Sequence, residues 1–192
     1  QADGNLSVSM GFLLDEHEEL MSNISINPTH VMFNGKRIDV IPSTVIYEKD
    51  KITINDFELR EDQMLLLGID GTASKERSDS VRIYFNNTDL GTILASFNFS
   101  SVQGSINGGV VINQALADPV IQTDNFRIEN IHTQTDTIGT LILEGNWDNI
   151  KNGLILDADL KNRGENYVCI NGFVPMGGEE PMNLDVDITH LP

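Results

Sequence analysis

Residues that could bind a metal are scattered along the chain. The four histidines, His17, His30, His132 and His190, are far apart in the sequence and share no ligand spacing. A zinc site in a protein usually has pairs of Cys or His at short intervals. The DEHEE run at residues 15–19 is expected to be a solvated charged turn rather than a cation site. The sequence therefore predicts no metal and no cofactor.

Acidic side chains are abundant, and two pairs of them are two residues apart. Asp157 and Asp159 form one pair, and Asp185 and Asp187 form the other, with apolar residues between and around them. Residues two apart on a strand point to the same side, so each pair is predicted to mark the wet face of an amphipathic strand. A glycosidase uses paired carboxylates where a cleft raises one pKa. Among 29 acidic residues chance pairs are unavoidable, and no catalytic pair is assigned.

The remaining reactive or stacking residues are few. Cys169 is the single cysteine, so a disulfide framework is excluded, and this residue is expected to be a small buried hydrophobe. Trp147 is a candidate sugar-stacking platform, although a packed strand end is the favoured interpretation. The chain has no G-x-S-x-G elbow and no phosphate-binding loop, and Gly108-Gly109 precedes a strand rather than a helix. We therefore expect a protein that is not an enzyme.

The charge of the chain excludes two classes of partner. Twelve basic residues stand against 29 acidic ones, and the net charge is −17. Nucleic acid and anionic membrane surfaces both require clustered Lys and Arg, so neither is an expected partner. No run approaches the roughly 18 to 20 apolar residues of a membrane span. The 192 residues are expected to form a single domain. The start at Gln1 without a signal segment predicts a mature form or an excised segment, and the strand barely finished at Leu191-Pro192 favours a segment of a longer protein.

Alternation of apolar and polar residues is the main structural signal. The stretch from Ser105 to Trp147 contains three such runs in a row, which predicts strands with one wet and one apolar face. Gly108-Gly109 is expected to open the first run, and Pro119 to separate it from the second. Similar runs cover most of the chain, at the spacing of all-β folds, and predict about thirteen or fourteen strands.

Local signals add detail to this prediction. Asn34-Gly35 between two apolar runs predicts a hairpin. A slip in alternation between Ile54 and Phe57 predicts a bulge near Asn55. Helical spacing predicts one short helix at about 89–97, capped by Thr88 or Asp89. The expected fold is all-β, a long curled antiparallel sheet that forms an open or partly closed groove.

The order of these motifs resembles the AsmA-like and TamB-like envelope proteins of the translocation and assembly module. The residues that carry the resemblance are NTDLGTIL (87–94), GSINGGVVINQALADPVIQTDNFRIEN (104–130), IGTLILEGNWD (138–148), LILDADLKN (154–162), NGFVPMGGEEPMNLDVDITHL (171–191) and the strand pairs of 27–61. No single motif is specific, and the likeness rests on their order and spacing over most of the chain.

The resemblance implies a periplasmic β-groove segment of an inner-membrane-anchored protein. Such a groove would carry phospholipid or nascent outer-membrane protein strands toward an outer-membrane barrel partner, whose contact regions are absent from these 192 residues. Its lining would come from the apolar faces of the predicted strands. The candidate ligand-binding residues are Val110, Ile112, Phe126, Ile128, Leu141, Leu143, Leu156, Leu160, Val186 and Ile188.

The alternative interpretation is a surface β-sandwich that acts as an adhesin or glycan-binding module. It requires two facing sheets and exposed aromatic residues. The chain has 6% aromatic residues and one Trp, which provides few stacking platforms. The apolar groove is therefore the preferred hypothesis.

Overall fold

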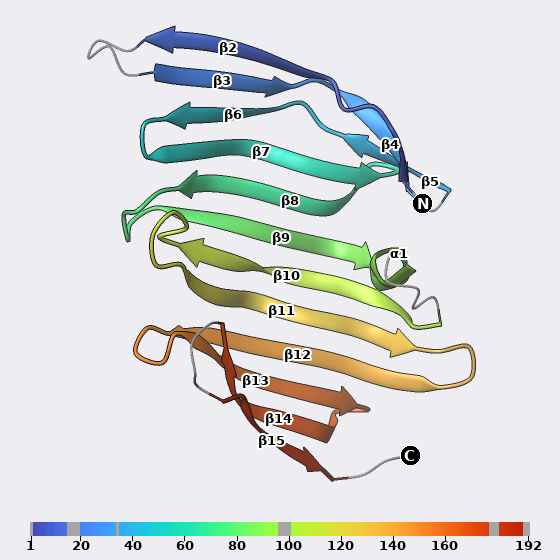
Figure 1. Cartoon of the computed structure of the whole chain (residues 1–192). Coiled ribbons are helices and arrows are strands. Elements are labelled where there is room, and N and C mark those ends of the chain that lie inside the picture. The colour runs from blue at the N-terminus through green and yellow to red at the C-terminus, as the bar shows by residue number, and fades with distance from the viewer. Residues whose placement is uncertain (1, 15–19, 34, 96–100, 177–180, 190–192) are drawn as a thin grey trace. The chain divides into compact units, whose positions relative to one another are not determined.

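The computed structural model describes residues 2–14, 20–33, 35–95, 101–176 and 181–189. This part contains fifteen strands and one short helix (Figure 1). Every strand pairing described is antiparallel, so the expected all-β antiparallel fold with one short helix is confirmed. The elements are β1 (Ala2–Gly4), β2 (Val8–Leu14), β3 (Leu20–Ile26), β4 (Thr29–Phe33), β5 (Lys36–Val40), β6 (Ser43–Glu48), β7 (Lys51–Glu61), β8 (Met64–Ala73), β9 (Ser80–Asp89), α1 (Leu90–Ala95), β10 (Gln103–Asn113), β11 (Val120–His132), β12 (Thr137–Asp148), β13 (Gly153–Asn162), β14 (Glu165–Pro175) and β15 (Asn183–Ile188).

The chain forms two compact units. Unit 1 contains residues 1–87 and 111–119, and unit 2 contains residues 88–110 and 120–192. Strand β10 begins in unit 2 and ends in unit 1, so the chain passes from one unit to the other within a single strand.

Strand β7 is the centre of unit 1, because two branches of the ladder share one of its edges. Its first half pairs with β6, which continues to β3 and β2, and its second half pairs with β5, which continues to β4 and β1. Pro42 lies between β5 and β6, where it breaks the strand because it has no N–H to donate. Its neighbour Ile41 donates its N–H to the carbonyl of Glu58 at 3.0 Å, which holds the junction on β7.

Two predicted irregularities of unit 1 are confirmed. The register of β7 against β8 shifts between Ile54 and Phe57, and Asp56 within this bulge has a φ of 50°. The expected hairpin connects β4 and β5, and Gly35 has a φ of 80° that favours glycine. Asn34, the other turn residue, lies outside the described residues.

The loop between β8 and β9 is held by charged and polar contacts within unit 1. The carboxylate of Asp79 accepts a hydrogen bond from Ser74 Oγ at 2.9 Å and pairs with Lys51 Nζ at 3.1 Å. These two contacts, the Ser74 bond first, lower the pKa of Asp79. Leu116, in the chain between β10 and β11, donates its N–H to the Ser74 carbonyl at 3.1 Å and ties that segment to the loop.

Unit 2 is a ladder in which β11 to β15 follow one another in sequence order, with β10 beside β11 (Figure 1). Helix α1 precedes this ladder and begins where predicted, because the Asp89 carboxylate caps it. That carboxylate accepts hydrogen bonds from the N–H of Gly91 at 3.0 Å and from Thr92 Oγ1 at 2.7 Å. Leu90 and Thr92 are the buried residues of the helix, and residues 96 and 97 of the predicted helix lie outside the described part.

One expectation about β10 is wrong. Gly108 does not open the strand, because β10 begins at Gln103 and Gly108 lies in its interior. It stands beside a bulge in β11, where the register shifts between Gln122 and Arg127 and Asn125 has a φ of 49°. A Cβ built on Gly108 would collide with the Asn125 carbonyl, so glycine is required by the close approach of two backbones.

Candidate functional site

One face of unit 2 is apolar from β11 to β15. The register places Leu141 opposite both Ile128 and Leu160, Leu160 opposite Val168, and Val168 opposite Ile188. Opposite residues in an antiparallel ladder point to the same side of the sheet. We define the apolar face of unit 2 by Ile128, Leu141, Leu143, Gly145, Trp147, Leu154, Leu156, Ala158, Leu160, Val168, Ile170, Gly172, Val174, Leu184, Val186 and Ile188.

The opposite face of unit 2 carries acidic side chains, together with the apolar residues Ile142, Ile155 and Phe173. Its cross-strand rows contain Glu144, Asp157, Asn171 and Asp185 in one line. A second row runs through Asp159, Cys169 and Asp187. The prediction that the two Asp pairs mark the wet side of their strands is therefore confirmed. Arg127 Nε bonds Glu129 Oε1 at 2.8 Å on this face, and Asn107 donates to Glu129 Oε2 at 2.8 Å.

The ladder brings most of the candidate residues together. Seven of the ten lie on the apolar face of unit 2: Ile128, Leu141, Leu143, Leu156, Leu160, Val186 and Ile188. Phe126 precedes Arg127, which is on the polar face, so strand alternation puts Phe126 on the same side as Ile128. Val110 and Ile112 fall in different units, Val110 in unit 2 and Ile112 in unit 1.

Exposure on this face rises toward the edge strand. Ala158 on β13 is 4% exposed, whereas Val186 and Ile188 on β15 are 56% and 53% exposed. Strand β15 pairs only with β14 among the described strands, so the ladder of unit 2 ends there. The strand pairings described within unit 2 from β11 to β15 are all between ladder neighbours.

Unit 2 has shallow depressions, and two of them are lined mainly by residues of the polar face. The larger has a volume of about 510 Å³ and lies at the β11 bulge, between Arg127, Ile142, Glu144 and Asn146, with Phe126 and Leu143 at its border. The smaller, about 350 Å³, is lined by residues that include Asp157, Asn171, Phe173 and Lys151. Neither is an enclosed apolar cavity.

Unit 1 has an apolar face of the same kind, which the choice of candidate residues missed. The register aligns Met10 with Ile24, Ile24 with Val45, and Val45 with Ile54. Ile54 lies opposite Gly71, which lies opposite Val81 on β9. Their alternation was visible in the sequence, and the missing signal was the pairing that joins the strands. We define the apolar face of unit 1 by Val8, Met10, Phe12, Leu14, Leu20, Ile24, Ile26, Val45, Tyr47, Ile52, Ile54, Phe57, Leu59, Leu67, Ile69, Ala73, Val81 and Ile83.

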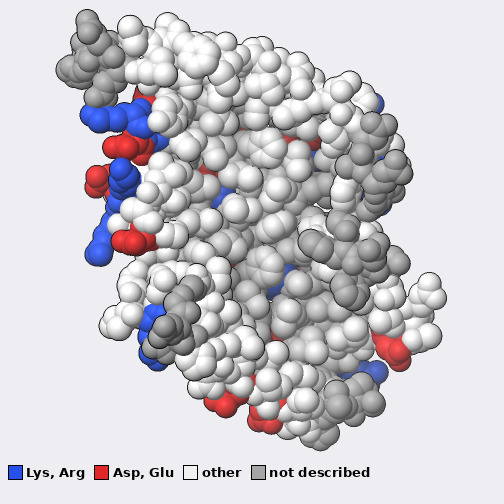
Figure 2. Space-filling view, in the orientation of Figure 1, with Lys and Arg blue, Asp and Glu red and all other residues white. Residues whose placement is uncertain are grey.

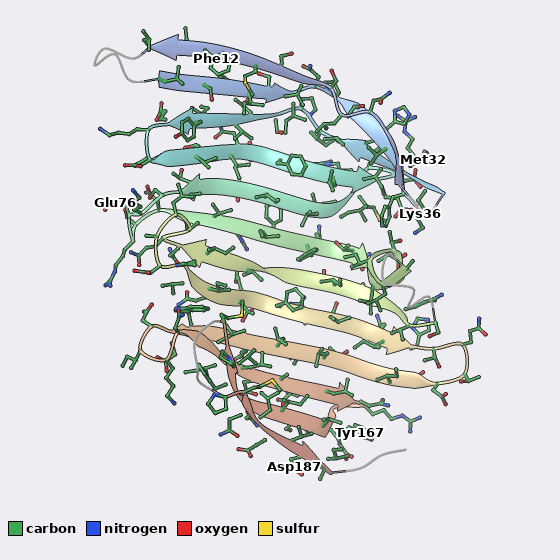
Figure 3. The ribbon with its side chains drawn as sticks, viewed as in Figure 1. Phe12, Met32, Lys36, Glu76, Tyr167 and Asp187 are labelled. Atoms are coloured by element: carbon green, nitrogen blue, oxygen red, sulfur yellow. The ribbon has the colours of Figure 1, made fainter. Side chains whose placement is uncertain are left out.

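Charged groups of unit 1 gather at the turns rather than on this face. Lys75 Nζ pairs with Asp50 at 3.3 Å, and Lys51 Nζ pairs with Asp79 at 3.1 Å. Figure 2 shows Lys, Arg, Asp and Glu side chains at the left margin, where Figure 3 labels Glu76. In the same view β6 to β8 are largely covered by uncharged side chains. The face of unit 1 is therefore apolar with a charged margin.

Glycines on the polar faces are covered by aromatic rings. The ring of Tyr84 on β9 lies over Gly68 on β8, and the Arg82 guanidinium is 5.7 Å from the ring centroid. Burial, followed by the negative charge of nearby Glu58, raises the pKa of Tyr84. In unit 2 the ring of Phe173 covers Gly153, with Lys151 Nζ at 5.6 Å from the centroid. These rings replace side-chain packing that glycine lacks.

Cys169 differs from its prediction. It lies half-buried on the polar face, between Asp159 and Asp187, rather than in an apolar core. A hydrogen bond with Asp159, and secondly burial, raises the pKa of its thiol, so the thiol stays protonated and is a weak nucleophile. Trp147 is half-buried on the apolar face opposite Leu154, close to the end of β12.

The described residues hold no group of three or more His, Cys, Asp or Glu that is arranged to bind a metal ion. His17 and His190 lie outside them. None of the helices described has the length and apolar character required to cross a membrane.

Comparisons with protein-family models, with curated proteins and with solved structures found no match to this chain. Function is therefore inferred from the faces of the two units.

Proposed function

We propose that the chain is a segment of an apolar conduit that holds lipid acyl chains against its sheet, as the resemblance to AsmA-like and TamB-like envelope proteins implies. The observation that carries the proposal is the apolar face of unit 2. The residues that define it carry no charge, and the register adds one acidic residue on that side, Glu165, at the start of β14. The other face of the same strands carries Glu144, Asp157, Asp159, Asp185 and Asp187.

This difference between the two faces favours an apolar partner on one side. An antiparallel sheet with one apolar face normally buries it under helices or a second sheet. The only helix described in unit 2, α1, has six residues, and α1 precedes the ladder. Contiguous exposed apolar surface marks a binding surface for an apolar partner. The acidic face would keep such a complex in water.

The dimensions suit an acyl chain. Strands in a sheet are about 4.8 Å apart, so the five strands β11 to β15 extend roughly 19 Å across the ladder. The hydrocarbon of one bilayer leaflet is about 15 Å thick. A fatty acyl chain laid across these strands would therefore stay on the apolar face of unit 2 along its whole length.

The proposal places the chain in the periplasm, as part of an inner-membrane-anchored protein that delivers phospholipid, or nascent outer-membrane protein strands, toward an outer-membrane barrel. Of these cargoes the apolar face favours the acyl chain. A face of aliphatic side chains and one indole supplies mainly dispersion contacts and area burial, which suit hydrocarbon.

Adjacent residues on β12 provide a matched test. Leu141 is on the apolar face, and Ile142 is on the polar face beside Arg127. Leu141→Arg should abolish phospholipid co-purification in native mass spectrometry, because a charge on that face must be desolvated by an acyl chain. Ile142→Arg should retain the lipid, since its guanidinium points to water.

A photoreactive residue gives a second measurement on the same strand. At Leu143 it should crosslink to acyl chains, and at Glu144, on the other face, it should not. The proposal is wrong if purified wild-type protein is free of lipid, or if both positions crosslink equally while circular dichroism shows native folding.

A further inference from the structure

Strand β2 is an edge with unusual properties. Its sequence, VSMGFLL, has no charged residue and no proline, and all seven residues are exposed. Phe12 is 62% exposed and Leu13 is 64% exposed (Figure 3 labels Phe12). Among the strands that the structure describes, β2 pairs only with β3. Its outer side therefore presents a strand backbone that has no described partner strand.

The direction of the backbone groups follows from one hydrogen bond. Asn27 donates its N–H to the Ser7 carbonyl at 2.9 Å, so Ser7 points toward β3. Backbone groups alternate in an antiparallel strand, so Ser9, Gly11 and Leu13 also point toward β3. The N–H and C=O groups that point to the open edge belong to Val8, Met10, Phe12 and Leu14.

Natural sheet edges are usually protected against pairing by charges, prolines or bulges. The edge strand of unit 2 has such protection. If β15 paired antiparallel with a second β15 around Val186, Asp185 would stand opposite Asp187 on both sides, and like charges directly opposite are destabilising. Strand β2 has no equivalent protection, although the chain as a whole carries a net charge of −17.

We propose that β2 is a self-association edge, which pairs antiparallel with β2 of a second copy of this chain around a two-fold axis at Gly11. Gly11 is the middle residue of the strand, so this register pairs its full length. Val8 then lies opposite Leu14, and Met10 opposite Phe12. The outward backbone groups of both copies are satisfied by about eight hydrogen bonds.

The side chains fit this register. Met10 and Phe12 both lie on the apolar face of unit 1, where a thioether beside an aromatic ring is a favourable contact. At the axis the two Gly11 residues form a non-hydrogen-bonded pair, in which the backbones come closest. The axis is perpendicular to the sheet, so the apolar faces of the two copies of unit 1 lie on one side of the joined sheet.

Charge substitution at Gly11 tests the proposal directly. A Cβ on Gly11 would have its nearest neighbour, the Asn23 carbonyl oxygen, at 4.0 Å, so a side chain is accommodated in the monomer. Gly11→Asp would place two carboxylates opposite each other across the axis and should raise the dimer Kd at least about tenfold. Gly11→Ser, which adds a side chain without charge, should remain dimeric.

Sedimentation velocity over a range of concentrations, in the absence of lipid, is the assay. Gly11→Lys should also be monomeric, and an equimolar mixture of Gly11→Asp and Gly11→Lys should form a heterodimer. Salt should strengthen the wild-type dimer, because it screens the repulsion between two chains of the same charge. Circular dichroism of each variant establishes that it is folded.

A crosslink tests the register. In a Cys169→Ser background, Gly11→Cys should form an intermolecular disulfide, since opposite Cα atoms are about 4.5 Å apart in such a pair. Ser9→Cys should not crosslink, because it lies opposite Leu13. A wild-type chain that stays monomeric, a Gly11→Asp variant that dimerises like wild type, or open-ended oligomers would each overturn the proposal. These outcomes leave the lipid-binding proposal untouched, since the assay contains no lipid.

Discussion

Two glycines with the same φ distinguish a conformational requirement for glycine from a steric one. Gly108 and Gly164 both have a φ of 87°. Gly164, in the turn between β13 and β14, has no atom within 4 Å of the position that a Cβ would occupy, whereas a Cβ on Gly108 would collide with the backbone carbonyl of Asn125. Alanine at either position therefore meets the same unfavourable φ, and the two substitutions differ in the space available for the new Cβ.

The expected losses of stability follow from this comparison. A non-glycine residue in the left-handed region costs about 1 kcal/mol, and this is the whole expected effect of Gly164→Ala. Gly108→Ala adds overpacking against a backbone that cannot rotate away, which costs about 2 kcal/mol more. The total for Gly108→Ala is therefore about 3 kcal/mol. The change in unfolded-chain entropy is the same for both substitutions and cancels in their difference.

Urea unfolding followed by circular dichroism measures both free energies of unfolding. Wild type and the two variants are compared at one protein concentration, so that self-association does not enter the difference. Equal losses for the two variants would refute the idea that the close approach of β10 to the β11 bulge requires glycine. A loss of stability in Gly164→Ala with none in Gly108→Ala would contradict the presence of the bulge in β11.

Three further predictions concern stability. Asp89→Ala removes the cap of α1 and should lower the free energy of unfolding by about 1 kcal/mol in urea titrations, whereas Asp89→Asn should lose less. The pKa of Asp79 is lowered in the folded state, so its ionised form stabilises the fold above the ordinary value of 3.8, and this contribution disappears as the pH falls through the lower folded value. Asp79→Asn should therefore be less stable than wild type at pH 7, and the two unfolding curves should converge in acid; a constant difference would contradict this. Tyr84→Ala uncovers Gly68 and should cost about 2 kcal/mol, whereas Tyr84→Phe should cost less, and equal losses would mean that the hydroxyl rather than the ring matters.

The strands, the hairpin and the helix start were predictable because their signals are local. The bulge near Asn55 was visible as a slip in alternation between Ile54 and Phe57. Asp89 was one of two candidate caps, and its hydrogen bonds identify it. In each case a few neighbouring residues determine the conformation.

The features that were missed depend on residues far apart in the sequence. The branch at β7 requires β3 to pair with β6 across the β4–β5 hairpin, which no local pattern specifies. The role of Gly108 depends on Asn125 in the next strand. Cys169 was expected to be buried because free cysteine behaves as a small hydrophobe, but strand alternation puts it on the polar face with Asp159.

The same limit applies to the candidate site. Seven candidate residues share the apolar face of unit 2, because alternation within each strand was read correctly and the register then aligned the strands. Val110 and Ile112 were grouped by adjacency in one run, yet β10 passes from one unit to the other between them. The apolar face of unit 1 was left out of the candidate residues, although its strands alternate in the same way.

The branch at β7 also bears on how such a chain can change length. Ile26 at the end of β3 lies directly opposite Ser43 at the start of β6. Residues 27–42 therefore leave the pairing of β3 with β6 and return to it at the same position along the two strands. That excursion contains the β4–β5 hairpin, which buries Ile38 and Val40 beside the second half of β7. Residues inserted at the tip of this hairpin, beside Gly35, would lengthen it without disturbing the alignment of β3 with β6 or the pairing of β5 with β7. Unit 1 therefore has a place where added length is accommodated by the rest of the sheet.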